Sequence, residues 1–146
     1  MAKVDSILSY CRYDLLIDDL DTLLIPFAEQ DGIGVINAAP LHMGLLTEQG
    51  APDWHPAPPE LHLAVNEVRL SCGERDIDLS ELALRFCFDY PHVASTLVGM
   101  STPDHVRRNL HAFRVPTDAE MVSQVKAILA PVSNLVWASG RPENCD

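Results

Sequence analysis

Three short apolar runs along the chain alternate with longer segments in which apolar residues recur at helical spacing. The first run, residues 5–13 (DSILSYCRY), combines apolar, β-branched and aromatic residues between polar ones, as short buried strands do. The second, residues 33–38 (IGVINA), is apolar nearly throughout, which is typical of a strand covered on both faces of its sheet. The third is residues 93–100 (VASTLVGM). The pattern predicts three strands separated by helices.

The segments between and after these runs predict helices. The first has leucines at helical spacing, aspartates in its first turn and Gly32 as a C-terminal stop, and Pro26 is expected to bend it. A proline-rich loop at residues 47–60 precedes the next two and is long enough to be functional. The predicted helices span residues 18–32, 60–74, 79–91, 102–113 and a last segment that begins at Thr117.

Two of these helices begin with recognisable capping residues. Asp78 and Glu81 have the spacing of a capping box. Thr102 can cap the fourth helix, Pro103 suits its first helical position, and Asp104 favours the positive end of the helix dipole. These residues therefore predict where the two helices start.

Strands that alternate with helices favour a parallel sheet in an α/β fold, whose ligands bind beyond the carboxyl ends of the strands. AAPLHMG follows the second strand and GMSTPDH follows the third, so both turns lie on that rim. Small residues let a ligand approach the backbone, and the second turn leads into a helix N-terminus, which favours a phosphate. These turns predict a site for a phosphate-bearing cofactor.

Composition narrows the class of protein. With 146 residues, 47% of them hydrophobic, the chain suits one globular domain spanning residues 1–146. Its net charge of -11 disfavours nucleic acid and anionic membranes as partners, and it lacks an apolar run of bilayer length or a signal peptide. We therefore expect a soluble cytoplasmic protein. The four cysteines are scattered without metal-ligand spacing, so we expect reduced thiols and no metal site.

Three stretches, SYCRY, GVINAAPLHMGLLTEQGAPDWHPAPPEL and STLVGMSTPDHVRRNL, together resemble the aldo-keto reductases, and the likeness is strongest to sugar dehydrogenases of that family. It runs over almost the whole chain. The resemblance implies an NAD(P)-dependent oxidoreductase with a (β/α)8 TIM barrel, a fold of about 250 residues. The chain matches the last three βα units and the C-terminal helix, so the expected fold is a partial barrel of the α/β class, the C-terminal part of the oxidoreductase domain.

The resemblance also assigns the cofactor contacts of a nicotinamide dinucleotide. Tyr10 stands where the family often places a glutamine on the nicotinamide carboxamide, and Ala39 where a serine is common. The turn from Pro40 would wrap the pyrophosphate, and the turn from Gly99 would meet the adenosine ribose. The implied cofactor-binding residues are Tyr10, Ala39, Leu41, Met43, Gly44, Gly99, Met100, Ser101, Thr102, His105, Arg108 and Asn109.

Two of these residues bear on the choice between NAD and NADP. Members that bind a 2'-phosphate often have a lysine or arginine where this chain has the neutral Met100. Arg108, which replaces a frequent glutamate, could compensate. NAD is the favoured cofactor, with NADP as the alternative.

The catalytic residues that the family uses, an aspartate, a tyrosine, a lysine and a histidine, belong to the first half of its barrel, so no catalytic residue is assigned here. The chain has two lysines, Lys3 and Lys126, and neither is placed to assist Tyr10 or Tyr13. Trp54 either covers the substrate pocket or anchors its loop. The histidines without assigned roles, expected to be surface or loop residues without carboxylate partners, are His42, His55, His62, His92 and His111.

Two hypotheses of function are consistent with these observations. In the first, the chain is the C-terminal part of an NAD(P)-dependent enzyme acting on a sugar or another small carbonyl substrate, contributes cofactor contacts and is inactive alone. In the second, it is a non-catalytic half-barrel that binds a nucleotide or a partner protein. In either case, three strands taken from a closed barrel leave two open edges and one apolar sheet face that would normally pack inside, so we expect self-association.

Overall fold

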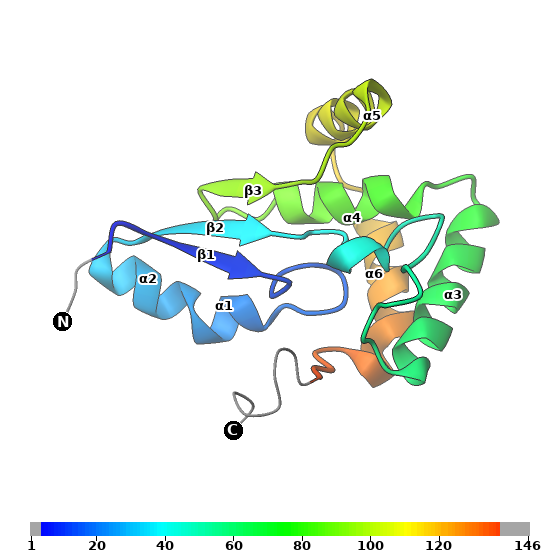
Figure 1. The fold of residues 1–146 in the computed structure, drawn as a ribbon, viewed down its shortest axis with the longest axis horizontal. Coiled ribbons are helices and arrows are strands. Elements are labelled where there is room, and N and C mark those ends of the chain that lie inside the picture. Colours follow the sequence, from blue (N-terminus) through cyan, green and yellow to red (C-terminus); the bar gives the residue numbers. More distant parts are fainter. Residues whose placement is uncertain (1–3, 138–146) are drawn as a thin grey trace.

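A computed structural model describes residues 4–137 of the chain (Figure 1). Three parallel strands, β1 (Ser6–Tyr10), β2 (Gly34–Ala38) and β3 (Ser95–Leu97), form one sheet in the order β1-β2-β3. All three arrows in Figure 1 point the same way, so the carboxyl ends of the strands meet on one rim. The three predicted strands are confirmed, and so is their parallel arrangement.

Helices connect these strands and follow the last one. The predicted helix 18–32 is divided at Leu24, next to Ile25 and Pro26, and Gly32 ends it in a left-handed conformation with φ of 67°. None of the helices in residues 4–137 is both long enough and apolar enough to cross a bilayer. The helices are α1 (Asp19–Leu23), α2 (Ile25–Asp31), α3 (Pro59–Gly73), α4 (Leu79–Phe88), α5 (Pro103–Arg114) and α6 (Ala119–Leu129), with 3-10 turns η1 (His42–Gly44) and η2 (Ala130–Val132).

Side-chain caps fix three of the helix starts. The Asp78 carboxylate accepts hydrogen bonds from the amides at the start of α4, and the Thr102 hydroxyl accepts one from His105 at the start of α5. The last helix begins later than predicted: its cap is Asp118, which accepts from the Met121 amide, rather than Thr117. A carboxylate is the stronger acceptor for the free amides of a helix N-terminus.

Buried apolar side chains form two clusters. The larger one joins α3, α4 and α6 through residues such as Leu61, Leu82 and Val125, which are fully buried. The smaller one lies between α1, α2 and the sheet and includes Leu20 and Val35. Helices therefore cover one face of the sheet (Figure 1).

The other face of the sheet is open in the described part of the chain. Leu8, Tyr10 and Leu97 point from it and are 53%, 57% and 47% exposed, whereas Val35 and Asn37 on the covered face are buried. The expectation that β2 is covered on both faces is therefore wrong for residues 4–137. A three-stranded layer with helices on one side has the shape of a sector of a barrel, with its inward side facing solvent.

The open face leads us to predict self-association of the purified chain. Replacing Leu8 with Lys should shift the chain toward the monomer in light scattering, because a charged side chain on the open apolar face opposes its burial against a second copy. Leu70→Lys is the matched control, since Leu70 is equally apolar and 71% exposed but lies on α3. A monodisperse wild-type monomer at working concentration would contradict the prediction.

Candidate active site

The turn after β2 has an unusual backbone. Ala39, His42 and Met43 have positive φ angles of 61°, 50° and 53° although none is glycine, and Gly44 follows with φ of 95°. Such conformations cost about 1 to 3 kcal/mol for a non-glycine residue and persist where the surroundings hold them. Here the His42 amide donates to the Ala39 carbonyl at 2.9 Å and the Gly44 amide to the Leu41 carbonyl at 3.0 Å. The turn is thus strained, and its own backbone hydrogen bonds hold it in place. Strained backbone of this kind is often found at functional sites.

One cavity lies on the α5 side of this turn, with a volume of about 200 Å³, and is called here the α5 cavity. It brings together five of the predicted cofactor contacts from two separate turns and one helix. Its other walls come from the loop that starts at Thr47 and from the beginning of α4. The five predicted residues in its lining are Leu41, Gly99, His105, Arg108 and Asn109.

The charges around the α5 cavity are mainly acidic. Arg108 forms an ion pair with Asp78, which raises the pKa of the guanidinium. Glu48 and Glu81 also line the cavity, and Glu81 pairs with Arg85. The arginine and two of the three carboxylates of the lining are therefore paired, and Glu48 is the carboxylate of the lining without an ion-pair partner in residues 4–137.

Three more predicted residues lie directly before α5. Met100 is half exposed. The Thr102 hydroxyl serves as the helix cap, and the Ser101 amide donates to Nδ1 of His105 at 3.3 Å. The turn from Gly99 is thus held against α5 by its own side-chain hydrogen bonds.

A second cavity of about 330 Å³ lies on the β1 side of the turn and is called here the Trp54 cavity. Tyr10 and Met43 line it from the predicted set, together with Trp54, Trp137 and Cys11. Ala39 and Gly44 belong to the turn that separates the two cavities. The structure thus distributes the predicted residues along the carboxyl rim of the sheet, on either side of one turn.

Cys11 and the tyrosines of this rim hold their protons more tightly than free side chains do. Burial, followed by the nearby Asp14 carboxylate, raises the pKa of the Cys11 thiol to about 12. Burial and the adjacent Cys11 raise the pKa of Tyr10, and burial, followed by Cys87 and two aspartates, raises that of Tyr13. Lys126, the only lysine in residues 4–137, is bound to Asp18 at 2.8 Å. These tyrosines therefore have no lysine beside them in the described part.

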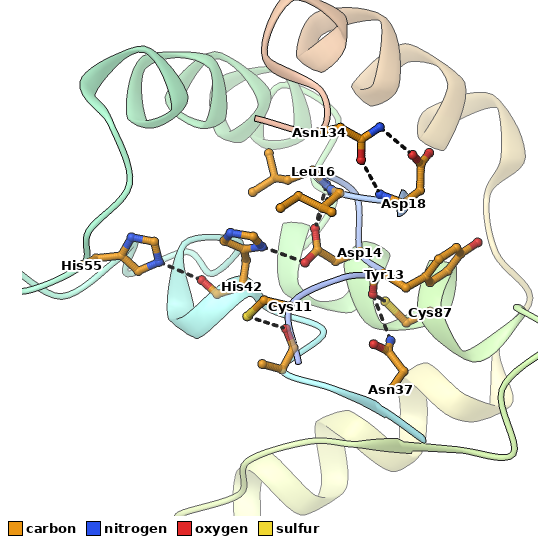
Figure 2. A network of polar contacts seen from close by, with 12 residues as sticks. Cys11, Tyr13, Asp14, Leu16, Asp18, Asn37, His42, His55, Cys87 and Asn134 are labelled. Atoms are coloured by element: carbon orange, nitrogen blue, oxygen red, sulfur yellow. Dashed lines mark hydrogen bonds and ion pairs between the residues drawn. The ribbon is translucent and has the colours of Figure 1, made fainter. Parts of the chain in front are cut away.

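Sequence reasoning missed a buried acid–histidine pair, which Figure 2 shows. Nδ1 of His42 lies 2.7 Å from Oδ2 of Asp14, and both side chains are fully buried. The other Asp14 oxygen accepts from the amides of Leu16 at 2.8 Å and Ile17 at 3.1 Å. Asp14 follows β1 and His42 follows β2, so both residues lie on the same rim of the sheet. This shared position is the signal from which their contact could have been predicted.

The expectation for the other histidines holds only in part. Nε2 of His55, a buried residue, donates to the His42 carbonyl at 3.0 Å (Figure 2), and burial, with His42 and His62 nearby, lowers the pKa of its ring. His92 and His111 lie on the surface but have carboxylate partners, Glu29 at 2.6 Å and Glu81 at 3.2 Å. No group of three or more possible metal ligands occurs among residues 4–137. The polar network is therefore centred on Asp14 and His42.

Comparison with known proteins places this rim in context. A family model described as "Aldo/keto reductase family" matches residues 1–130. The chain is 44% identical to L-galactose dehydrogenase of Arabidopsis thaliana over 146 residues, 97% of this chain and 45% of that protein. It is 24% identical to D-arabinose 1-dehydrogenase of Saccharomyces cerevisiae, over 97% of this chain and 46% of that protein. The chain thus spans about half the length of these curated relatives.

The fold is shared with solved structures. Aldo-keto reductase AKR11C1 from Bacillus halodurans, in its holo form, superposes with a TM-score of 0.67 and 24% identity, over 93% of this chain and 45% of that one. The apo form gives the same TM-score and identity, with 46% of that chain covered. The three-stranded layer with its helices is therefore a partial (β/α)8 barrel, as expected.

The buried pair predicts a large effect on stability. Asp14→Ala should lower the free energy of unfolding by about 3 to 5 kcal/mol, because it leaves three buried donors, Nδ1 of His42 and two amides, without their acceptor, at about 1 to 3 kcal/mol each. Chemical denaturation of the purified variant measures it. Asp53→Ala, at an exposed loop position, is the control and should change stability by no more than about 0.5 kcal/mol. Equal stability of the two variants would contradict the structural role given to Asp14.

Proposed function

The chain belongs to the aldo/keto reductase family, and on that premise we propose that residues 1–146 form the C-terminal, cofactor-binding part of an NAD(P)-dependent sugar dehydrogenase. Its cofactor would be a nicotinamide dinucleotide, and its substrate an aldose that is oxidised at C1. The likeness to L-galactose dehydrogenase, which the sequence motifs also favour, supports this substrate class. The proposed location is the cytoplasm.

The observation that carries the proposal is the pair of cavities on either side of the turn after β2. Leu41 lines one and Met43, two residues later, lines the other. An extended dinucleotide fits this arrangement with its adenosine in the α5 cavity, its pyrophosphate along the turn and its nicotinamide beside Tyr10. Two features suit a ligand in the α5 cavity: a Cβ at Gly99 would meet nothing within 4 Å, and Nδ2 of Asn109 is buried without a partner in residues 4–137.

The charges in the α5 cavity support NAD over NADP. A 2'-phosphate would enter a site where the Glu48 carboxylate has no ion-pair partner in residues 4–137, and a like charge there opposes its binding. Arg108 already pairs with Asp78, so it is not free to compensate for the neutral Met100. The acidic surroundings and the paired arginine both favour an unphosphorylated ribose.

The bound dinucleotide would supply hydride transfer, and the residues of this chain would hold and orient it. They are not proposed to move the proton, because Tyr13 is buried against Phe86 and Tyr90 and the Lys126 ammonium is engaged by Asp18. We propose that the acid and base come from the remaining strands of a complete barrel, which would also cover the open face of the sheet.

The open face of the sheet is also consistent with a second function. A half-barrel with Leu8 and Leu97 uncovered could serve as a non-catalytic module that binds a nucleotide or a partner protein. Assays of the purified chain and of a complete barrel with L-galactose and NAD distinguish the two. We expect the chain alone to be inactive and the complete barrel to be active; an inactive complete barrel would favour the second function.

Cofactor binding by the chain tests the proposal directly. We expect calorimetry to detect NAD with a dissociation constant between micromolar and millimolar, since only part of the cofactor site is built here. Gly99→Val should weaken binding at least about tenfold, because the new side chain would occupy open space in the α5 cavity without straining the backbone. Gly73→Val is the control, since a Cβ there also meets nothing within 4 Å and Gly73 lies at the end of α3. Unchanged NAD binding in Gly99→Val would refute the assignment.

The preference for NAD gives a separate prediction. Met100→Lys should raise the affinity for NADP relative to NAD by about fivefold or more, because an ammonium beside the ribose attracts a 2'-phosphate. The measurement is the ratio of the two dissociation constants. Val106→Lys, at an exposed position of α5, controls for the added charge alone. An equal ratio in both variants would count against the placement of Met100 at the ribose.

A further inference from the structure

The Asp14–His42 pair leaves one ring nitrogen without a partner. A carboxylate only accepts hydrogen bonds, so Nδ1 of His42 carries the proton that it donates to Asp14, and in the neutral ring Nε2 keeps a free lone pair. Nε2 is buried and has no hydrogen-bond partner among residues 4–137. The two amide bonds to the other oxygen fix the carboxylate, so the orientation of the ring is fixed as well. This geometry prepares Nε2 to accept a hydrogen bond.

His42 forms part of the wall of the Trp54 cavity. The edge of its ring meets Trp137, with centroids 5.4 Å apart and planes at 72°. Trp54 lines the same cavity and is 70% exposed, so its indole is available to a ligand. Arg12, the one cation in the lining, is paired with Asp19 at 2.6 Å. The lining thus combines aromatic surfaces with a residue whose Nε2 is unsatisfied, and because the His42 side chain is fully buried, a ligand reaches Nε2 only when the wall of the cavity shifts.

We propose that His42, positioned by Asp14, binds a hydroxyl group of an aldose in the Trp54 cavity and thereby helps to select the substrate. The inference rests on the proposed function, because it names a substrate contact of the same rim. The sugar hydroxyl donates to Nε2, and an indole packs against the apolar C–H face of the sugar ring. A site of this kind, mostly apolar with a few polar groups that fix orientation, is typical of small-molecule pockets, and about 330 Å³ lies at the lower end of their range.

The same cavity contains Tyr10, where the nicotinamide is proposed to lie. Sugar and nicotinamide must meet for a hydride to pass between them, so a sugar contact on the Trp54 side of this cavity is consistent with the cofactor placement. A buried acceptor that loses its partner is costly, and a site built around one therefore rejects ligands that lack the matching hydroxyl. His42 would thus contribute to specificity rather than to hydride transfer.

The test uses the full chain and L-galactose as the probe. Ring 15N spectra of the wild type should first show His42 with its proton on Nδ1, and the Nε2 resonance should then move as L-galactose is added. The His42→Asn variant should bind L-galactose about tenfold more weakly by the change in tryptophan fluorescence; asparagine tolerates the left-handed backbone at this position, where φ is 50°. His62→Asn is the control, because His62 contacts His55 but does not line the cavity.

Three results would overturn the inference: no L-galactose binding, binding without movement of the His42 Nε2 resonance, or equal affinity in wild type and His42→Asn. The wild-type spectra decide the matter even if the variant does not fold. NAD binding is measured by calorimetry on the same samples, so the two proposals fail separately. NAD binding without a sugar response would reject only the role of His42, whereas a sugar response without NAD binding would reject only the cofactor site.

Discussion

The hydrogen bonds of the Asp14 carboxylate connect the loops at the carboxyl rim of this sheet. One of its oxygens holds the amides of Leu16 and Ile17 and so shapes the loop after β1, and the other holds His42 in the turn after β2 (Figure 2). Strand pairing alone fixes Tyr10 opposite Ala38 but does not determine the paths of the loops after the two strands. Because the carboxylate is fully buried, its bonds to both segments are protected from water and screened little by salt. Both cavities are bounded by the turn that this contact anchors.

The end of the described chain depends on the same loop. The Asn134 amide donates to the Leu16 carbonyl at 2.9 Å, and the Asn134 side chain bridges the backbone and carboxylate of Asp18. Burial alone would raise the pKa of that carboxylate, but its bonds to Lys126 of α6 and to Asn134 together lower it. Trp137, three residues beyond Asn134, therefore comes to rest against His42. A wall of the Trp54 cavity is thus supplied by a segment more than a hundred residues away in sequence from the loop that anchors it.

Much of the fold could be predicted from the sequence because its signals are local. A helix cap depends only on residues within one helical turn. The structure confirms the predicted helix ends at Gly32, Asp78 and Thr102. The predicted start of α6 is wrong because Thr117 and Asp118 are both good caps and the sequence does not rank them by geometry. The apolar run of β2 does not show whether its second face is covered by the same chain, so the open face was predicted only by the resemblance to part of a closed barrel.

The site was less accessible to sequence reasoning. The turns at Gly44 and Gly99 could be placed on one rim from strand order. The residue types do not predict the left-handed backbone at Met43, nor that Leu41 and Met43 line different cavities. Arg108 pairs with Asp78, 30 positions away in the sequence. The sequence alone would count Arg108 as a free cation that could bind a phosphate, whereas in the structure its charge is already paired.

The same argument applies to the pair at the centre of the rim. His42 and Asp14 are 28 positions apart, and neither stands out in its own stretch of sequence. Each becomes informative only once β1 and β2 are known to be parallel neighbours, because residues that follow adjacent parallel strands lie on the same edge of the sheet. Polar residues just after such strands are therefore worth comparing in pairs before any is dismissed as a loop residue. In this chain that comparison leads to the one buried acid–histidine contact in residues 4–137.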